Sequence, residues 1–427
     1  MPATFLDAVD LEAIARRVGT PFYLYDAATL RRRIADVRAI APGDGVQARY
    51  ALKACSLRRV LDVMREADVW IDAVSGNEVL RARAAGFPAG AQPPVILLSA
   101  DVFRDNALAV VLEHGALPNI GSPAMIDTLR RAGYRGPVGV RINPGFGHGH
   151  VQATDTGGPS SKHGIWADDL YAVRQAAAAA GLPVVLLHAH VGSGPRIDEF
   201  TANMGRLAHF VTELVADFPD LEAVNMGGGI PHPYRPDAPT IDLAPVGRAL
   251  REARRAPAPA PGATCASRSS RAATSWRPAW CWWRASPTSS APPPTTRGRG
   301  TRSSWSTPAS PTWCGRRCTA RTTTSPCTAP ARTPWSSRSS SPACCASRAT
   351  SSPATRTSSS TRALPRPRIG DLIVLHDTGA YGLQMSSHYN SLGRAPQVWL
   401  EDDRLHLAAR REALADIVRA ECFEPLD

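Results

Sequence analysis

One long segment of this sequence lacks twelve of the twenty amino acids. Residues 256–363 contain none of the following: Leu, Ile, Val, Met, Phe, Tyr, Asp, Glu, Lys, His, Asn and Gln. Without large aliphatic side chains, a segment cannot bury enough apolar surface to offset the conformational entropy lost on folding. As written, these 108 of the 427 residues therefore do not encode an ordinary folded domain.

The same segment lacks every acidic residue, and this decides what the net charge of +12 means. It holds 15 of the 49 arginines and lysines, so the other 319 residues carry 34 basic against 37 acidic side chains. A basic protein ordinarily suggests a nucleic-acid or anionic-membrane partner. Here the excess charge belongs to one segment, and we expect neither partner.

Cysteine is scarce outside that segment, where only Cys55 and Cys422 occur. Two isolated thiols give no disulfide framework and are typical of a reducing compartment. Residues 1–15 lack the basic flank and apolar run of a signal peptide. No stretch is long and apolar enough to span a bilayer. These absences predict a cytoplasmic protein.

Short apolar runs alternate with helical patterns between residues 46 and 255. Seven runs have the length and composition of strands: 46–52, 69–73, 94–99, 117–120, 138–143, 184–191 and 223–226. Segments with apolar residues at three- and four-residue spacing follow them: 57–67, 76–85, 103–114, 123–132, 167–180 and 199–218. Repeated βα units predict an α/β fold, and seven strands favour a (β/α)8 TIM-type barrel over an open doubly wound sheet. We expect the eighth strand within residues 256–363.

Further β-type runs occur at both ends of the chain. They are 20–25, 371–376, 397–401 and 405–409. Asp402, Asp403 and Arg404 join the last two runs as a hairpin turn. We therefore expect a second, smaller all-β domain formed by both chain ends. The predicted boundaries are 1–25 and 364–427 for this β domain, 26–255 for the barrel and 256–363 for the anomalous segment.

The anomalous segment has two explanations. Its Ser, Pro and Arg content suits a disordered linker, but its seven Trp and seven Cys do not. A GC-rich gene translated out of frame gives the same restricted alphabet. When GC-rich codons are chosen and two nucleotides are dropped, residues 267–288 can become EIEPGRDIVAAGLVLVARVTD, 306–320 can become VDTGFTDLVRPALYG and 340–352 can become LAGLLCESGDVF. We hypothesise a frame error that replaces the last barrel strand and much of the β domain.

Lys53 stands in YALKA at the end of the first predicted barrel strand. In a (β/α)8 barrel, the loops after the strands form the active site. Apolar neighbours would desolvate an amine there and favour its neutral form, which forms a Schiff base with an aldehyde cofactor. On this motif alone, a solvated lysine at a strand end is the commoner explanation.

The sequence HAHVGSG at 188–194 ends the sixth strand. The imidazole of His190 could stack on a cofactor ring, and the small residues after it bring backbone N–H groups and the Ser193 hydroxyl close to an anion. His188 and His190 would share one strand face, so metal binding is an alternative. No third ligand stands near at a suitable spacing, which makes a metal site the weaker interpretation.

Three consecutive glycines, Gly227, Gly228 and Gly229, follow the seventh strand. They leave backbone amides open to a phosphate, which barrels often bind after late strands. A flexible turn explains them equally well. Tyr381, in HDTGAYG, displays a hydroxyl after another β-type run.

Polar residues also follow other predicted strands. Asp72, Ser75 and Glu78 come after the second strand, and the RINPG sequence at 141–145 ends the fifth. Each is explained singly as a helix cap or turn residue. Together they would converge on one rim, as an active site in a barrel requires.

With these residues in place, the sequence resembles the diaminopimelate decarboxylase family, among the fold-type III, alanine-racemase-like enzymes that use pyridoxal 5'-phosphate. The matching stretches are YALKACS, DAVSGNE, VRINPGFGHGH, TGGPSSKHGIW, HAHVGSG, MGGGI, TRALP and LIVLHDTGAYG. They cover about residues 24–255 and again 361–427. The resemblance implies decarboxylation of meso-2,6-diaminopimelate to L-lysine, in lysine biosynthesis, by a homodimer.

The resemblance also implies residue roles. Lys53 resembles the lysine that binds the cofactor covalently, and His190 the residue stacked on its pyridine ring, so these two are the candidate catalytic residues. Tyr381 resembles a tyrosine that contacts the cofactor phosphate, and we also assign it to substrate binding. The cofactor-binding set is Lys53, Asp72, His190, Ser193, Gly227, Gly228, Gly229 and Tyr381. No metal is expected.

Two family motifs are absent from the sequence as written. Glu-Pro-Gly-Arg supplies the carboxylate at the pyridine nitrogen, and Cys-Glu-Ser-Gly-Asp supplies a catalytic cysteine and a substrate-binding glutamate across the dimer interface. Both occur only in the shifted frame of residues 256–363, and Cys344 or Cys345 is no substitute. The polypeptide as written is therefore predicted to be impaired. The alternatives are a decarboxylase or racemase of another amino acid and a non-catalytic cofactor-binding relative.

Overall fold

The computed structural model describes residues 5–40, 46–90, 92–149, 155–194, 196–232, 242–248, 277–281 (backbone only), 368–422 and 424. The chain divides into two compact units. One consists of residues 1–28 and 285–427, and the other of residues 29–284. Predictions for most of the anomalous segment fall outside the described residues.

Within the described part of residues 29–284, eight parallel strands close into a ring. Their order is β2 (Gln47–Ala51), β3 (Trp70–Ala73), β4 (Ile96–Ala100), β5 (Leu117–Ile120), β6 (Val138–Asn143), β9 (Val184–Ala189), β11 (Ala223–Asn225) and β12 (Arg277–Cys281). Each strand pairs with the next, and β12 closes the ring by pairing with β2. The predicted (β/α)8 barrel is confirmed, with its eighth strand inside the anomalous segment.

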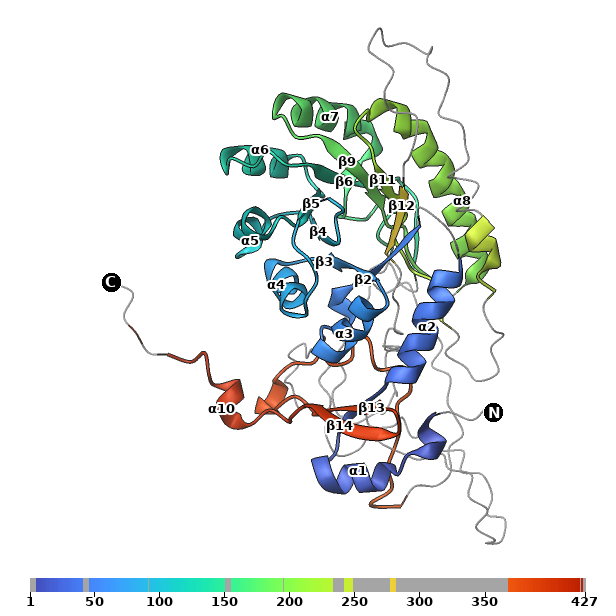
Figure 1. Cartoon of the computed structure of the whole chain (residues 1–427), viewed down its shortest axis with the longest axis vertical. Helices are drawn as coiled ribbons and strands as arrows, with labels where there is room; N and C mark the ends of the chain where they lie inside the picture. Colours follow the sequence, from blue (N-terminus) through green and yellow to red (C-terminus); the bar gives the residue numbers. More distant parts are fainter. Residues whose placement is uncertain are drawn as a thin grey trace, which may run out of the picture. The chain divides into compact units, whose positions relative to one another are not determined.

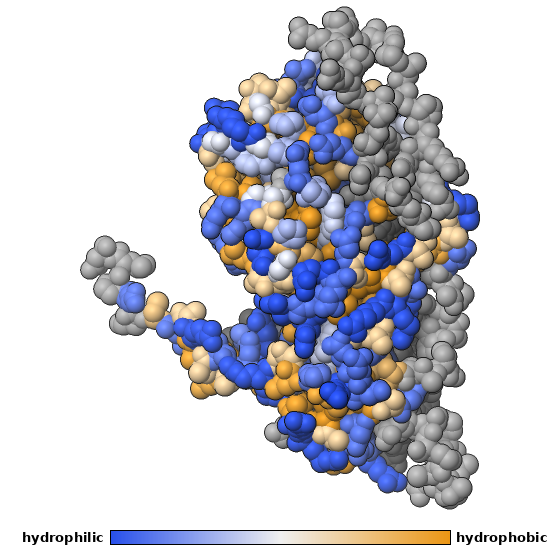
Figure 2. Space-filling model, in the orientation of Figure 1, coloured by the Kyte–Doolittle hydropathy of each residue, from blue (hydrophilic) through white to orange (hydrophobic). Residues whose placement is uncertain are grey.

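Helices surround the ring (Figure 1). They are α2 (Ala27–Ile40), α3 (Arg58–Glu66), α4 (Gly76–Ala84), α5 (Ala107–His114), α6 (Ala124–Arg131), α7 (Leu170–Ala179) and α8 (Ile197–Leu214). Because helices cover the outer face and side chains fill the inner one, β9 is buried at every position. Figure 2 shows polar and apolar residues interspersed over the outer helices.

One predicted helix begins later than its pattern indicated. Residues 103–114 carry the helical periodicity, but α5 begins at Ala107. Asp105 has a φ of 46°, a left-handed conformation that a right-handed helix does not continue through. The residues between β4 and α5 therefore form a turn at the rim of the barrel.

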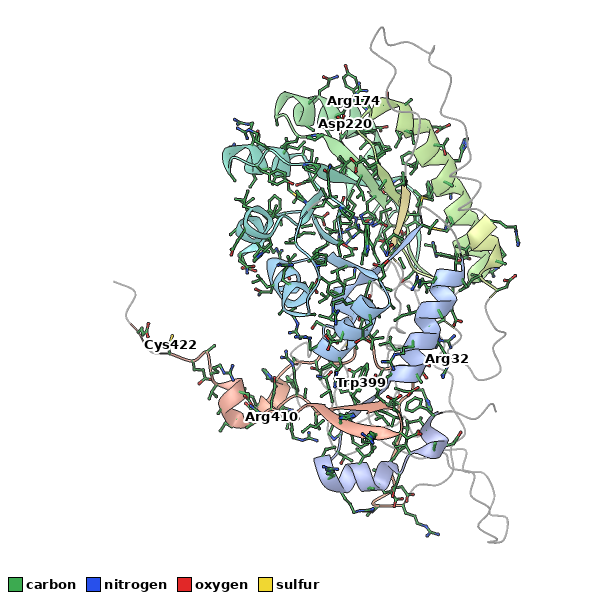
Figure 3. All side chains as sticks on the ribbon, viewed as in Figure 1. Arg32, Arg174, Asp220, Trp399, Arg410 and Cys422 are labelled. Carbon is green, nitrogen blue, oxygen red and sulfur yellow. The ribbon has the colours of Figure 1, made fainter. Side chains whose placement is uncertain are left out.

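In the other unit, strands from both chain ends form one sheet. β1 (Tyr23–Asp26) pairs in parallel with β13 (Gln397–Glu401), which pairs antiparallel with β14 (Arg404–Ala409). Asp402 and Asp403 have φ values of 50° and 57°, the tight two-residue turn that suits the strand twist of a hairpin. The side chain of Trp399 on β13 is buried, with its ring 6.4 Å from that of Tyr25 (Figure 3).

The predicted domain built from both chain ends is thus confirmed. It also contains α1 (Leu11–Val18), α10 (Leu414–Ile417) and the short helices η1 (Phe5–Ala8) and η6 (Tyr389–Ser391). The predicted run 371–376 is not a strand in this structure. A strand needs a hydrogen-bonded neighbour, and the described residues provide no more than an isolated bridge at Ile373.

Among the described helices, none is both long enough and apolar enough to cross a membrane.

Candidate active site

Lys53 lies directly after β2, in the short helix η2 (Leu52–Ala54), at the C-terminal end of the barrel. Its neighbours Leu52 and Ala54 are buried, whereas Lys53 is exposed. The backbone that carries the amine is therefore fixed by packing while the amine reaches solvent. The expectation that apolar neighbours desolvate Lys53 is wrong for this structure, because its side chain is not covered.

His190 follows β9 and is held by the glycine loop 227–229. The Gly228 N–H donates to His190 Nδ1 at 3.3 Å. A Cβ on Gly227 would lie 2.8 Å from His190 Cα and 2.6 Å from the Ala189 oxygen, so the two loops touch through their backbones. Desolvation, and then the charge of Lys53, lowers the pKa of His190 well below its usual value. His190 is therefore a neutral imidazole with its hydrogen on Nε2.

The glycine loop also touches the residues that follow His190. A Cβ on Gly229 would lie 2.2 Å from the Gly192 oxygen and 3.2 Å from Ser193 Cα. Gly227 and Gly229 have φ values of 71° and 107°, which L side chains rarely adopt. Ser193 is half-buried in β10 (Gly192–Ser193), which pairs with β7 (His148–Gly149). Two backbones packed this closely form a cradle of the kind that binds phosphate through N–H groups.

Lys53 and the glycine loop lie on the same rim. The strands that precede them, β2 and β11, both pair in parallel with β12, so their C-terminal ends face the same way. Gly227 also packs against His190, and the charge of Lys53 is near enough to lower the pKa of His190. The structure therefore brings together the amine, the imidazole and the glycines that the sequence assigned to one site.

Asp72 is buried near the end of β3, where its Oδ1 accepts a hydrogen bond from Ser99 Oγ at 2.7 Å. Just beyond it, Glu78 Oε2 accepts the Val74 N–H at 2.8 Å, and Ser75 Oγ accepts the Glu78 N–H at 3.2 Å. The bond to Ser75 caps the start of α4, and the bond from Val74 ties the preceding residue to it. Asp72 and Glu78 thus belong to the same rim as Lys53, whose charge acts on Glu78.

A polar loop is fastened beside His190. Thr156 Oγ1 donates to the His190 oxygen at 2.9 Å. Further along the loop, His163 Nδ1 lies 2.8 Å from Asp101 Oδ2. The loop leads into β8 (Ile165–Trp166), which pairs with β6. It is therefore held at both ends on the rim that carries Lys53.

Sequence reasoning missed Ser99 and Asn119 at this end of the barrel, and it considered His188 only as a metal ligand. Ser99, Asn119 and His188 are buried polar side chains at the penultimate positions of β4, β5 and β9. Asp72 has the same position in β3. A polar residue recurring just before the end of apolar strands is the signal that could have found them, because such positions face one layer of the barrel interior.

Two further expectations concern Tyr381 and metal binding. Tyr381 belongs to the other unit, where the Met385 N–H donates to the backbone carbonyl oxygen of Tyr381 at 2.9 Å. Its contact with a phosphate and with substrate stays a prediction. In the part of the chain that the structure describes, no three His, Cys, Asp or Glu side chains gather as a metal site. His188 Nδ1 is instead 2.7 Å from Asn119 Nδ2.

Known proteins are similar to this chain in sequence and in fold. Residues 27–274 match the family described as pyridoxal-dependent decarboxylase, pyridoxal binding domain. The diaminopimelate decarboxylase of Streptomyces coelicolor is 33% identical over 441 residues, covering 98% of this chain and 93% of the relative. That of Escherichia coli K12 is 32% identical over 434 residues, covering 98% and 97%.

Solved structures agree in fold. A crystal structure of a diaminopimelate decarboxylase, 29% identical, matches with a TM-score of 0.69 over 96% of this chain and 95% of its own. The Helicobacter pylori enzyme complexed with L-lysine, 21% identical, shares the fold with a TM-score of 0.70 over 96% and 98%. This chain belongs to the diaminopimelate decarboxylase family of pyridoxal-dependent decarboxylases.

Proposed function

We propose that this chain is a pyridoxal-phosphate-dependent carboxy-lyase that converts meso-2,6-diaminopimelate to L-lysine and carbon dioxide. The observation that carries the proposal is the meeting of Lys53, His190 and the glycine loop at one end of the barrel. An exposed primary amine beside a cradle of backbone N–H groups suits an aldehyde cofactor with a phosphate. The likeness to diaminopimelate decarboxylases over nearly the whole chain supports the substrate.

These residues fit pyridoxal 5'-phosphate. Lys53 would bind its aldehyde carbon, and His190 would lie against its ring. Ser193 with Gly227, Gly228 and Gly229 would hold its phosphate, since only glycine leaves room where these two loops touch. When bound, the cofactor supplies an electron sink for the carbanion that remains after carbon dioxide leaves.

Two cationic side chains at the rim suit the carboxylates of an amino-acid substrate. The cations Lys53 and Arg141 both act on His190 and His188, so they lie at the same rim. His190 is neutral and adds no charge to this rim. Each cation attracts a carboxylate of the amino-acid substrate, while the carboxylates of Asp72 and Glu78 on the same rim attract its ammonium groups. We assign Arg141 to this electrostatic role.

One specific observation favours a second candidate, a cofactor-binding relative without catalysis. The sequence as written lacks the carboxylate that keeps the pyridine nitrogen protonated, and it lacks the family's catalytic cysteine motif. Without that carboxylate the electron sink is weaker, while the residues that would hold the cofactor remain. We infer that the polypeptide as written binds the cofactor but turns over substrate poorly.

The chain offers a matched test, because Lys53 and Lys162 are its only two lysines. After gel filtration has removed free pyridoxal 5'-phosphate, which itself absorbs visible light, a cofactor absorbance band should remain with the wild type and with Lys162→Ala, but not with Lys53→Ala. After borohydride reduction, peptide mass spectrometry should find the label on residue 53. A band that persists in Lys53→Ala would refute the assigned lysine. Carbon dioxide release from diaminopimelate then separates the enzyme from the non-catalytic relative.

We also infer a cytoplasmic homodimer. The family resemblance supports the dimer, and the two cysteines whose side chains are described, buried Cys55 and exposed Cys422, are free thiols as in a reducing compartment. Size-exclusion chromatography with light scattering measures the oligomeric state. A mass of one chain at micromolar concentration contradicts the dimer.

A further inference from the structure

A chain of buried hydrogen bonds crosses the uppermost inner layer of the barrel. Ser99 Oγ on β4 donates to Asp72 Oδ1 on β3 at 2.7 Å. Asn119 Nδ2 on β5 lies 2.9 Å from Ser99 Oγ on one side and 2.7 Å from His188 Nδ1 on the other. All four residues are less than 10% exposed. These hydrogen bonds therefore lie beneath the rim that carries Lys53 and His190.

Gly139 allows the last of these bonds to form. Strand β6 lies between β5 and β9, and Gly139 is the register partner of Asn119. A Cβ at residue 139 would lie 2.9 Å from Asn119 Oδ1 and 2.8 Å from Leu186 Cδ2. Because this side chain is missing, Asn119 reaches across β6 to His188.

The donors and acceptors of these hydrogen bonds are compatible with one another in only one arrangement of the hydrogens. A carboxylate accepts, so the single hydroxyl hydrogen of Ser99 goes to Asp72. Ser99 Oγ must then accept from Asn119, which places the amide nitrogen, with its two hydrogens, between Ser99 and His188. His188 Nδ1 therefore accepts as well, and the ring carries its hydrogen on Nε2.

The Nε2–H group of His188 has no hydrogen-bond partner among the described residues. His188 and His190 stand two apart where β9 ends, so both face the interior of the barrel mouth. Desolvation, and then the charges of Arg141, His190 and Lys53, lower the pKa of His188 well below its usual value, which keeps the ring neutral. The Nε2–H group is thus the ring donor that the described hydrogen bonds leave available to an acceptor at the mouth of the barrel.

We propose that His188 is a further ligand-binding residue, which donates its Nε2–H to an anionic oxygen of the bound cofactor or substrate. Asp72, Ser99 and Asn119 act as positioning residues that fix this hydrogen. The proposal rests on the proposed function, which supplies the ligand. The oxygen belongs either to the cofactor or to a substrate carboxylate, and both offer the same chemistry to the imidazole.

Two substitutions separate the two ring nitrogens. Asn at residue 188 places an oxygen near the position of Nδ1, so it still accepts from Asn119, but it has no donor where Nε2 stood. Gln at residue 188 carries an N–H near the position of Nε2 but loses the acceptor toward Asn119. A ligand-binding role therefore predicts that His188→Asn harms binding more than His188→Gln, whereas a purely structural role predicts the reverse.

The measurement is the Kd of pyridoxal 5'-phosphate by absorbance titration, followed by the Kd of diaminopimelate in the cofactor-loaded protein. His188→Asn should weaken one of them about 10- to 100-fold, and His188→Gln only a few-fold. A weaker cofactor Kd assigns the oxygen to the cofactor, and a weaker diaminopimelate Kd alone assigns it to the substrate. Equal losses in the two variants, or a larger loss in His188→Gln, overturn the proposal.

A second measurement needs no ligand. In ¹⁵N-histidine-labelled wild-type protein, NMR should show His188 with its hydrogen on Nε2. Asn119→Asp replaces both amide hydrogens with acceptors, so His188 should gain a hydrogen on Nδ1. A wild-type His188 protonated on Nδ1 overturns the proposal whether or not the cofactor binds. A correct tautomer in a protein that fails to bind pyridoxal 5'-phosphate counts against the proposed function instead.

Discussion

At the scale of single residues, Glu78 links the capping of α4 to the charge of the rim. Desolvation raises its pKa to about 6, the hydrogen bond from Val74 N–H opposes this, and the charge of Asp72 adds to it. The pKa is therefore higher in the folded chain than in the unfolded chain, so the folded state binds this proton more tightly. Stability from this residue is complete below about pH 4.5 and is lost as the pH rises through about 6.

Glu78→Gln should remove the loss of stability at high pH, and its side-chain oxygen should still accept the Val74 N–H. At pH 8 the variant should be more stable than the wild type by about 1–2 kcal/mol, because one pKa unit corresponds to about 1.4 kcal/mol. Below about pH 4 the difference should vanish. Urea unfolding at several pH values measures the free energy of unfolding of the variant and of the wild type. A difference that does not change with pH would show that the carboxylate charge is not its cause.

Residue chemistry explains which parts of the site were predictable from sequence. Lys53 and Gly227 stand in short motifs at strand ends, where local sequence identifies both the residue and its position. Ser99 and Asn119 carry no such motif. Their partners come from other strands, and Asn119 meets His188 only because Gly139 leaves space between them. Contacts of this kind depend on register, which a single sequence does not specify.

At the scale of elements, strands flanked by clear turns were predicted best. β5 and β6 have the predicted bounds because each is a compact apolar run between polar turns. The start of α5 was missed because Asp105 takes a left-handed conformation inside a helical pattern. The run 371–376 has strand composition but no strand beside it, since pairing is a tertiary property.

The glycine loop gives a test at this scale, because Gly227 and Gly181 have nearly equal φ values of 71° and 68°. An alanine at either position has the same backbone strain, on the order of 1 kcal/mol. At Gly181 nothing lies within 4 Å of the added Cβ, whereas at Gly227 it meets the backbone of Ala189 and His190. Gly227→Ala must therefore displace the loop from His190.

We expect Gly181→Ala to lose about 1 kcal/mol of unfolding free energy and to bind pyridoxal 5'-phosphate normally. Gly227→Ala should lose more and should weaken cofactor binding at least about 10-fold, because the phosphate cradle no longer closes on Ser193. Urea unfolding and absorbance titration of the two variants provide the comparison. Equal cofactor affinity in both would remove the glycine loop from the site.

At the scale of the whole molecule, the closing strand of the barrel conflicts with its own sequence. β12 lies between β11 and β2, yet Arg277–Cys281 contains no Val, Ile or Leu. Pro278 alone does not make the conflict, because β5 carries Pro118 between β4 and β6 in the same barrel. The shifted frame replaces this stretch with one rich in Val, Ile and Leu, as a buried parallel strand requires. We propose, on this conflict, that residues 256–363 are read out of frame.

Net charge makes this proposal measurable on the intact protein. The chain as written has a charge of +12, while its residues outside 256–363 carry 34 basic and 37 acidic side chains. The stretches recovered in the shifted frame contain more acidic than basic residues, so a protein made from an uninterrupted frame is acidic. At pH 8 it should bind an anion exchanger and pass through a cation exchanger, and its mass should differ from 45.5 kDa. Because the recovered frame also restores the carboxylate for the pyridine nitrogen, that protein should release carbon dioxide from diaminopimelate, whereas the chain as written should release it far more slowly. Retention on the cation exchanger together with a mass of 45.5 kDa and full decarboxylase activity would show instead that the printed segment is genuine.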